Sequence, residues 1–80
     1  DGIDVENGLS TPNIEEAHFN GTMIEMSHQI IVLADSSKIG KRSLALIGPI
    51  SKIDVLITDA GITNEQKAAF ENVGIKLIIA

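Results

Sequence analysis

Three short apolar runs, separated by segments with helical patterning, constrain the fold of this chain more than any other feature. The runs cover residues 29–34, 53–58 and 75–79. Strands that are apolar throughout are buried on both faces, as in parallel sheets, and helices between them supply the crossover connections. The sequence therefore predicts an α/β fold, a parallel sheet with flanking helices in a doubly wound pattern.

A first helix is predicted from Thr11 to about Ser27. Thr11 is a favoured N-cap residue, and Pro12 suits the first helical position because its missing N–H costs nothing there. Gly21 weakens the middle of this helix by ~1 kcal/mol relative to alanine. Its expected apolar face comprises Ile14, Ala17, Phe19, Met23, Ile24 and Met26. Residues 1–12 are rich in Gly, Asn, Asp and Ser and are predicted to form a loop.

Two further helices are expected downstream. Residues 38–47 are predicted to form a short helix that ends at Gly48-Pro49. The sequence from Thr63 to Gln66 has the form of a capping box, which predicts a helix extending to about Val73 and ending at Gly74.

Composition excludes several functions for this chain by itself. Eleven acidic against six basic residues give a net charge of −5 and no basic patch, so we expect no direct contact with nucleic acid. The absence of cysteine excludes disulfides and thiol catalysis and fits a cytoplasmic protein. No apolar run has the ~18 residues of a membrane span. The start at Asp1, without methionine, leads us to expect a part of a larger protein.

The loop after the first apolar run is the best candidate ligand site. It carries Ser36, Ser37, Lys38 and Gly40. In open α/β sheets, ligands bind beyond the carboxyl ends of the strands, and two hydroxyls with a lysine suit a phosphate. An ordinary strand-to-helix turn with a solvated lysine explains the same residues equally well.

Other polar residues allow a functional and a structural interpretation. Asp1 could accept hydrogen bonds from sugar hydroxyls or act as a general base, but acids beside Gly2 are also common turn chemistry. Asp59 fits a turn or cap better than a catalytic role. His18 and His28 lack a third ligand nearby, so no metal site is predicted.

Taken in order, several segments resemble the DeoR family of bacterial transcriptional repressors. They are residues 1–4 (DGID), 7–17 (NGLSTPNIEEA), 23–24 (MI), 33–40 (LADSSKIG), 53–54 (ID) and 56–59 (LITD). The resemblance implies the C-terminal half of an effector-sensing domain whose fold is similar to ribose-5-phosphate isomerase and glucosamine-6-phosphate deaminase. It also implies a phosphorylated sugar effector, and DNA binding through an N-terminal winged helix-turn-helix that is absent here, as is the first half of the sensor.

Carried over position by position, the resemblance implies a set of effector-binding residues. Lys38 matches a lysine that contacts the substrate phosphate in the related deaminases. The implied set is Asp1, Gly2, Asn7, Thr11, Asn13, Ser37 and Lys38, with no catalytic residue, metal or cofactor. The chain departs from the family at Asn20-Gly21, where a basic pair is usual, at Ser36 in place of histidine, and at Ile39 in place of phenylalanine.

These observations lead to an expected function and two alternatives. We expect a sensor module in a homo-oligomeric repressor, because such repressors bind symmetric operators. The first alternative is a sugar-phosphate isomerase or deaminase of the same fold, since an acidic turn and a lysine suit either role. A flavodoxin-like or receiver-like interaction domain is the third interpretation, and it lacks the acidic cluster that a phospho-acceptor would need.

Overall fold

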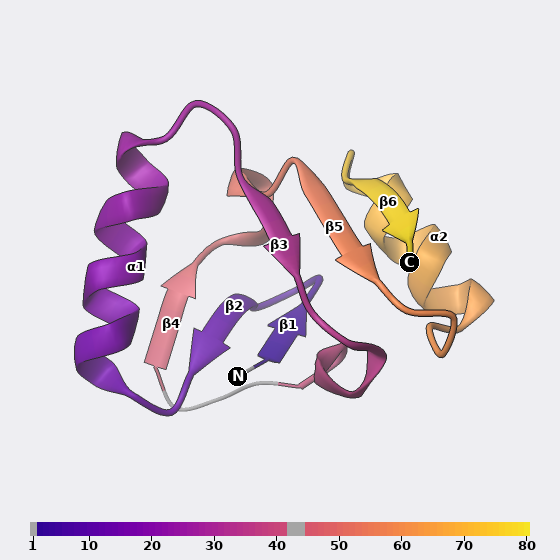
Figure 1. Cartoon of the computed structure of the whole chain (residues 1–80), viewed down its shortest axis with the longest axis horizontal. Helices are drawn as coiled ribbons and strands as arrows, with labels where there is room; N and C mark the ends of the chain where they lie inside the picture. The colour runs from indigo at the N-terminus through magenta and orange to yellow at the C-terminus, as the bar shows by residue number, and fades with distance from the viewer. Residues whose placement is uncertain (1, 42–44) are drawn as a thin grey trace.

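The computed structural model describes residues 2–41 and 45–80, which form two three-stranded sheets and two α-helices (Figure 1). Asp1 and residues 42–44, which lie in the middle of the predicted 38–47 helix, are outside the described residues. The elements in chain order are β1 (Gly2–Asp4), β2 (Gly8–Thr11), α1 (Ile14–Met26), β3 (Ile31–Leu33), the 3₁₀ helix η1 (Ser36–Lys38), β4 (Ala45–Gly48), the 3₁₀ helix η2 (Ile50–Lys52), β5 (Val55–Thr58), α2 (Asn64–Asn72) and β6 (Lys76–Ile79).

The predicted parallel sheet is present, in the order β3-β5-β6. Leu56 of β5 pairs with Val32 of β3 and with Leu77 of β6, so the three apolar runs lie side by side in register. Each strand begins one or two residues later than predicted, β3 also ends one residue earlier, and β5 and β6 end at the predicted residues. Leu56 is fully buried, whereas Ile31 and Leu33 of the edge strand β3 are 56% and 79% exposed. Apolar sequence therefore identified the strands correctly, but one face of this sheet is open in the described structure.

The prediction of a loop at residues 1–12 is wrong, because β1 and β2 form an antiparallel hairpin. The polar residues that suggested a loop make the turn of this hairpin. Asp4 Oδ1 accepts the N–H of Glu6 at 3.0 Å, and Asp4 Oδ2 accepts the Asn7 side chain at 2.6 Å. Gly8 has a φ of +83°, which is accessible to glycine at little cost. The polar residues therefore indicate a turn correctly, but strands of three and four residues are too short to be recognised from sequence.

The predicted helix at 38–47 is also wrong. The chain forms η1 at Ser36–Lys38 and later the strand β4, which pairs antiparallel with β2. Gly48 thus ends a strand and not a helix. The pairing joins Leu46 to Ser10, residues 36 positions apart, and its register shifts between Leu9 and Ser10. Residues 45–48 are extended because they pair with β2, which is distant in the sequence.

Helix α1 begins two residues later than predicted. Its N-cap is Asn13, whose side chain accepts the N–H of Glu16 at 2.9 Å, in place of Thr11. The expected apolar face is only partly confirmed, because Ala17 is buried and Ile24 is half-buried, but most of the larger side chains are exposed. The exposed ones are Ile14, Phe19, Met23 and Met26. Contact with β4 is made through Gly21, where an added Cβ would lie 3.0 Å from the Ile47 carbonyl oxygen.

Helix α2 matches its prediction and completes the core. Thr63 and Gln66 form both hydrogen bonds of the capping box, at 3.0 and 3.1 Å, and Gly74 follows the helix with a φ of +88°. Phe70 of α2 packs with Leu56 and with Ile3 of β1 in one cluster, so the core joins both sheets. Neither helix in the described ranges is long and apolar enough to cross a membrane.

Candidate functional site

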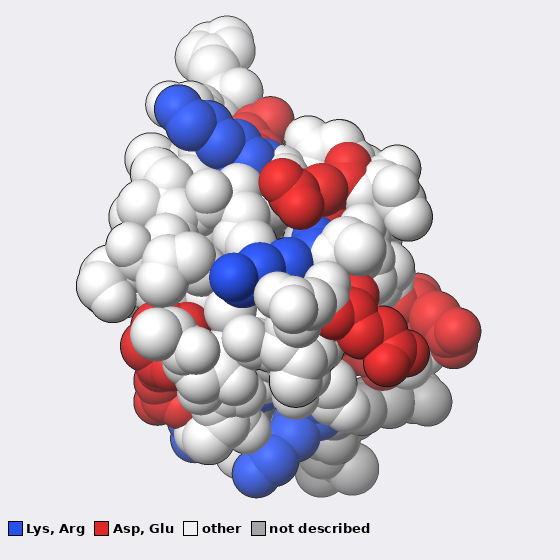
Figure 2. Space-filling model, turned by 90° about the vertical axis from the view of Figure 1, so that its right-hand side faces the viewer, with Lys and Arg blue, Asp and Glu red and all other residues white. Residues whose placement is uncertain are grey.

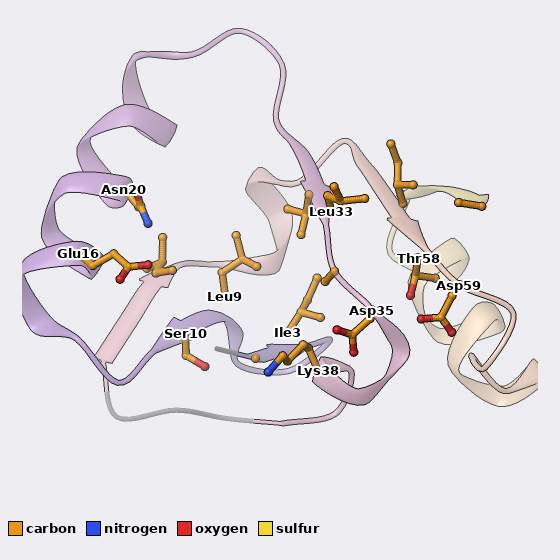
Figure 3. A pocket seen from close by; sticks show the side chains of 16 residues that line it. Ile3, Leu9, Ser10, Glu16, Asn20, Leu33, Asp35, Lys38, Thr58 and Asp59 are labelled. Atoms are coloured by element: carbon orange, nitrogen blue, oxygen red, sulfur yellow. The ribbon is translucent and has the colours of Figure 1, made fainter.

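A cavity of about 600 Å³ opens between the two sheets and α1 (Figure 3). Its walls combine apolar strand residues with a few polar side chains from four different elements or the turns that follow them. The polar residues lining it are Ser10, Glu16, Asn20, Asp35, Lys38, Thr58 and Asp59. Ligand sites in proteins have this composition, a mainly apolar wall with a small number of placed polar groups.

Lys38 is presented to the cavity by a tight turn after β3. Asp35 caps this turn: its Oδ1 accepts the Ser37 N–H at 2.9 Å and also the Ser37 hydroxyl. The Lys38 N–H donates to the Asp35 carbonyl at 3.0 Å. In Figure 3 the Lys38 side chain extends from η1 toward the side of the cavity where Ser10 lies. The half-buried lysine is therefore held at its backbone and free to reach a ligand with its amino group.

Asp59 follows β5 and organises the neighbouring turn. Its Oδ2 accepts the Ser36 N–H at 2.9 Å, and its Oδ1 accepts the Gly61 N–H at 2.8 Å. These hydrogen bonds, that from Ser36 first, lower the pKa of Asp59 below its usual value. The pKa of Asp35 is lowered in the same way by Ser37, with a smaller contribution from the charge of Lys38. Asp59 thus has the turn role that its sequence context predicts.

Gly2 and Ser10 line the cavity from the antiparallel sheet, together with Ile3, Leu9 and Ile47. Gly2 is buried, and the Lys41 carbonyl oxygen occupies the place where a Cβ would lie. Ser10 is 3% exposed on β2. Glycine at position 2 is therefore required by the close approach of the segment that follows η1, whatever ligand binds.

The structure brings two of the seven predicted site residues, Gly2 and Lys38, to this cavity. Asp1 lies outside the described residues. The other four make local contacts away from the cavity wall. Asn7 binds Asp4 in the hairpin turn, Asn13 caps α1, the buried Thr11 hydroxyl accepts the Asn13 N–H at 3.4 Å, and Ser37 binds Asp35.

Sequence reasoning missed Ser10, Glu16 and Asn20 as cavity residues. Ser10 lies in the segment that the sequence predicts to be a loop, Asn20 is one of the positions where the chain departs from the DeoR pattern, and no local pattern marks Glu16 as a cavity residue. Asp35 and Asp59 did carry a recognisable signal, because each lies within two residues of the carboxyl end of a strand of the parallel sheet.

The described residues contain no group of three or more His, Asp or Glu side chains placed to hold a metal ion. The cavity wall carries one lysine and three carboxylates, and two of these, Asp35 and Asp59, already accept backbone N–H groups. Such a site can bind an oxygen-rich ligand and place a negative group at the lysine. On the face shown in Figure 2, the Lys side chains are interspersed with Asp and Glu and form no basic patch among the described residues.

Comparison with known proteins agrees with the resemblance seen in the sequence. The profile of the DeoR C-terminal sensor domain matches residues 1–60. The chain belongs to this family. The curated relatives that the chain matches are named transcriptional regulators or repressors.

Three of these relatives illustrate the extent of the match. The transcriptional regulator GlpR of Haloferax volcanii is 34% identical over 95% of this chain and 30% of its own length. The transcriptional repressor AccR of Agrobacterium fabrum is 35% identical over 98% of the chain and 31% of its own length. The glycerol-3-phosphate regulon repressor of Escherichia coli K12 is 32% identical over 74% of the chain and 23% of its own length. The DeoR sensor chain described here thus spans less than a third of each.

Proposed function

We propose that this chain is an effector-sensing part of a transcriptional repressor and that its effector is a phosphorylated sugar. The phosphate lies at Lys38, and the sugar occupies the cavity between the two sheets. The observation that carries the proposal is the position of Lys38 on the cavity wall at the carboxyl end of a parallel strand. A lysine binds phosphate as a point charge, and a charge-assisted hydrogen bond contributes about 1.5–3 kcal/mol.

The names of the relatives favour regulation over the isomerase or deaminase alternative. The three relatives above are described as regulators or repressors, one of them of a glycerol-3-phosphate regulon. In the proposed protein, a winged helix-turn-helix outside this chain contacts DNA, which agrees with the net charge of −5 here. Effector binding then shifts the population of repressor conformations by its difference in affinity for them.

We further propose that this chain is the C-terminal part of its sensor domain, with a fold like that of the sugar-phosphate isomerases and deaminases. The open face of the parallel sheet supports this, because parallel sheets are covered on both faces in complete domains. Ile31, Leu33 and Ile78 are 56%, 79% and 40% exposed there. Other segments of the complete protein, or a second subunit of a homo-oligomer, would bury these side chains.

The test is a thermal-shift screen of the complete natural protein. The panel contains glucose 6-phosphate, ribose 5-phosphate, fructose 1-phosphate and glycerol 3-phosphate, each beside its unphosphorylated form. A ligand at about 100 times its Kd stabilises the protein by about 2.7 kcal/mol. We expect a thermal shift only with the phosphorylated form of a ligand. In Lys38→Ala, the affinity for that ligand should be about 10- to 100-fold lower.

Lys67→Ala is the matched control, since Lys67 lies on α2 and does not line the cavity. It should bind like the wild type. Equal shifts with phosphorylated and unphosphorylated sugars, or equal weakening in both lysine variants, would contradict the phosphate site at Lys38. Turnover of a panel member would instead favour the enzyme.

A further inference from the structure

We propose that Asp59 is a positioning residue, which orients the Lys38 turn and thereby sets the affinity of the site for phosphorylated ligands. The inference rests on the function proposed above. Asp59 directly follows β5 and is 21 residues from Lys38 in the sequence, so it acts on the Lys38 turn from outside that turn.

The first observation concerns the point at which the Lys38 turn leaves the parallel sheet. The last sheet hydrogen bond on this side joins the Ala34 N–H to the Ile57 carbonyl at 3.0 Å. Two residues later the Ser36 N–H donates to Asp59 Oδ2 at 2.9 Å. Asp59 therefore continues the contact between the two strands beyond the point where backbone pairing ends.

The second observation concerns the other end of the turn. The Gly40 N–H donates to the Ile3 carbonyl of β1 at 2.7 Å. Between these anchors the turn is closed by its own contacts, with the Lys38 N–H on the Asp35 carbonyl and the Ser37 N–H on the Asp35 side chain. The internal bonds fix the shape of the turn, whereas Asp59 and Ile3 fix its orientation to the two sheets.

The third observation concerns the rigidity of Asp59 itself. Its other oxygen accepts the Gly61 N–H at 2.8 Å, so both oxygens of the carboxylate are held. Gly61 is exposed, yet a Cβ there would overlap the Ser36 Oγ and lie 2.9 Å from Asp59 Oδ1. The turn after β5 thus packs directly on the turn that carries Lys38. A bound phosphate is placed well only if this contact is kept, because a misplaced lysine loses hydrogen-bond geometry.

The chain offers a close control at the opposite end of the same two strands. Asp54 precedes β5, and its Oδ2 accepts the Ile30 N–H at the start of β3 at 2.7 Å. This contact also joins a carboxylate of one strand to a backbone N–H of the other. Asp54 does not line the cavity. Asparagine has a single acceptor oxygen, so Asp54→Asn removes the charge and can keep its one bond, whereas Asp59→Asn removes the charge and can keep only one of two bonds. Only Asp59 is connected to the Lys38 turn.

The experiment uses the complete natural protein with Asp59→Asn, Asp54→Asn, Lys38→Ala and the Asp59→Asn/Lys38→Ala double variant. The probe is the panel member that gives the largest shift, measured by titration calorimetry. We expect Asp59→Asn to weaken the phosphorylated probe by about tenfold, Asp54→Asn to leave its affinity unchanged, and the double variant to bind no more weakly than Lys38→Ala alone.

Simple electrostatics predicts the opposite sign, because removing a negative charge from the cavity wall would strengthen phosphate binding. Tighter binding by Asp59→Asn, or additive losses in the double variant, would therefore overturn the inference. An equal loss of affinity in Asp54→Asn would reduce Asp59 to a general structural role.

A ligand-free measurement separates this inference from the proposed function. Hydrogen exchange of the 35–39 segment should accelerate in Asp59→Asn and stay as in the wild type in Asp54→Asn. If no panel member binds the wild type, the proposed effector is wrong, and the exchange result alone decides whether Asp59 orders the turn. Unchanged exchange in Asp59→Asn would refute the inference whatever the ligand.

Discussion

The Thr58 hydroxyl is buried on the cavity wall and makes no hydrogen bond to another described residue. A buried polar group without a partner costs about 1–3 kcal/mol. We therefore expect Thr58→Val to raise the free energy of unfolding by about 1 kcal/mol, measured by urea denaturation of this chain. Thr11→Val is the control, because the equally buried Thr11 hydroxyl accepts the Asn13 N–H, so its removal should destabilise the chain. A lower free energy of unfolding in Thr58→Val would mean that the Thr58 hydroxyl makes a hydrogen bond in the folded chain.

The carboxylates of Asp35 and Asp59 predict the response of the fold to acid. Hydrogen bonds lower the pKa of each in the folded state, from Ser37 for Asp35 and from Ser36 for Asp59. In the unfolded chain, the pKa of an aspartate is about 3.9. Their contribution to stability is therefore complete above that value and is lost as the pH falls through the folded-state pKa.

The thermal midpoint should accordingly fall steeply below about pH 4. Asp59→Asn lacks one of these titrating groups, so its deficit relative to the wild type should be largest near neutral pH and shrink in acid. Melting curves from pH 2 to pH 7 for both proteins check this. A deficit that stays constant over this range would show that the charge of Asp59 does not contribute.

Position 21 of helix α1 shows whether packing against β4 or helix propensity determines the more stable residue. Alanine is better than glycine in a helix by about 1 kcal/mol, so propensity alone predicts that Gly21→Ala stabilises. In the structure its Cβ would lie 3.0 Å from the Ile47 carbonyl oxygen of β4, a backbone atom in a paired strand. Overpacking of this kind costs about 1–3 kcal/mol, and we expect a net loss of about 1 kcal/mol.

Thr22→Ala on the exposed side of the same helix provides the comparison for Gly21→Ala. It should be neutral or slightly stabilising by urea denaturation, because it changes propensity without a packing contact. Stabilisation by both substitutions would show that β4 moves away from the helix at little cost.

The molecule as a whole depends on a small core that connects two sheets. Ile3 of β1 is 1% exposed and packs in the cluster that contains Leu56 and Phe70 of the parallel sheet and its helix. An isolated parallel bridge pairs Ile3 with Ile39, so the same residue also joins β1 through the backbone to the segment that follows η1. We expect Ile3→Ala to cost about 2–5 kcal/mol and to lower the stability of both sheets together.

Leu33→Ala is the control for Ile3→Ala, since Leu33 lines the same cavity but is 79% exposed. Its effect on the free energy of unfolding should stay within about 0.5 kcal/mol. Urea denaturation followed by circular dichroism and by hydrogen exchange of each sheet measures both. Loss of the antiparallel sheet alone in Ile3→Ala would show that the sheets fold independently.

Sequence by itself determined the elements whose stabilising contacts lie within a few residues. The capping box of Thr63 and Gln66 and the apolar run of β5 are examples, and so is the position of Lys38 in the turn after β3. Residues whose partners are distant in sequence were assigned only by the tertiary structure. Strand β4 exists because it pairs with β2, and Gly21 is needed because β4 crosses it. The cavity wall combines residues from α1, β2 and the turns after β3 and β5. No local pattern marks such a set, since its members become neighbours only when the two sheets pack on a shared core.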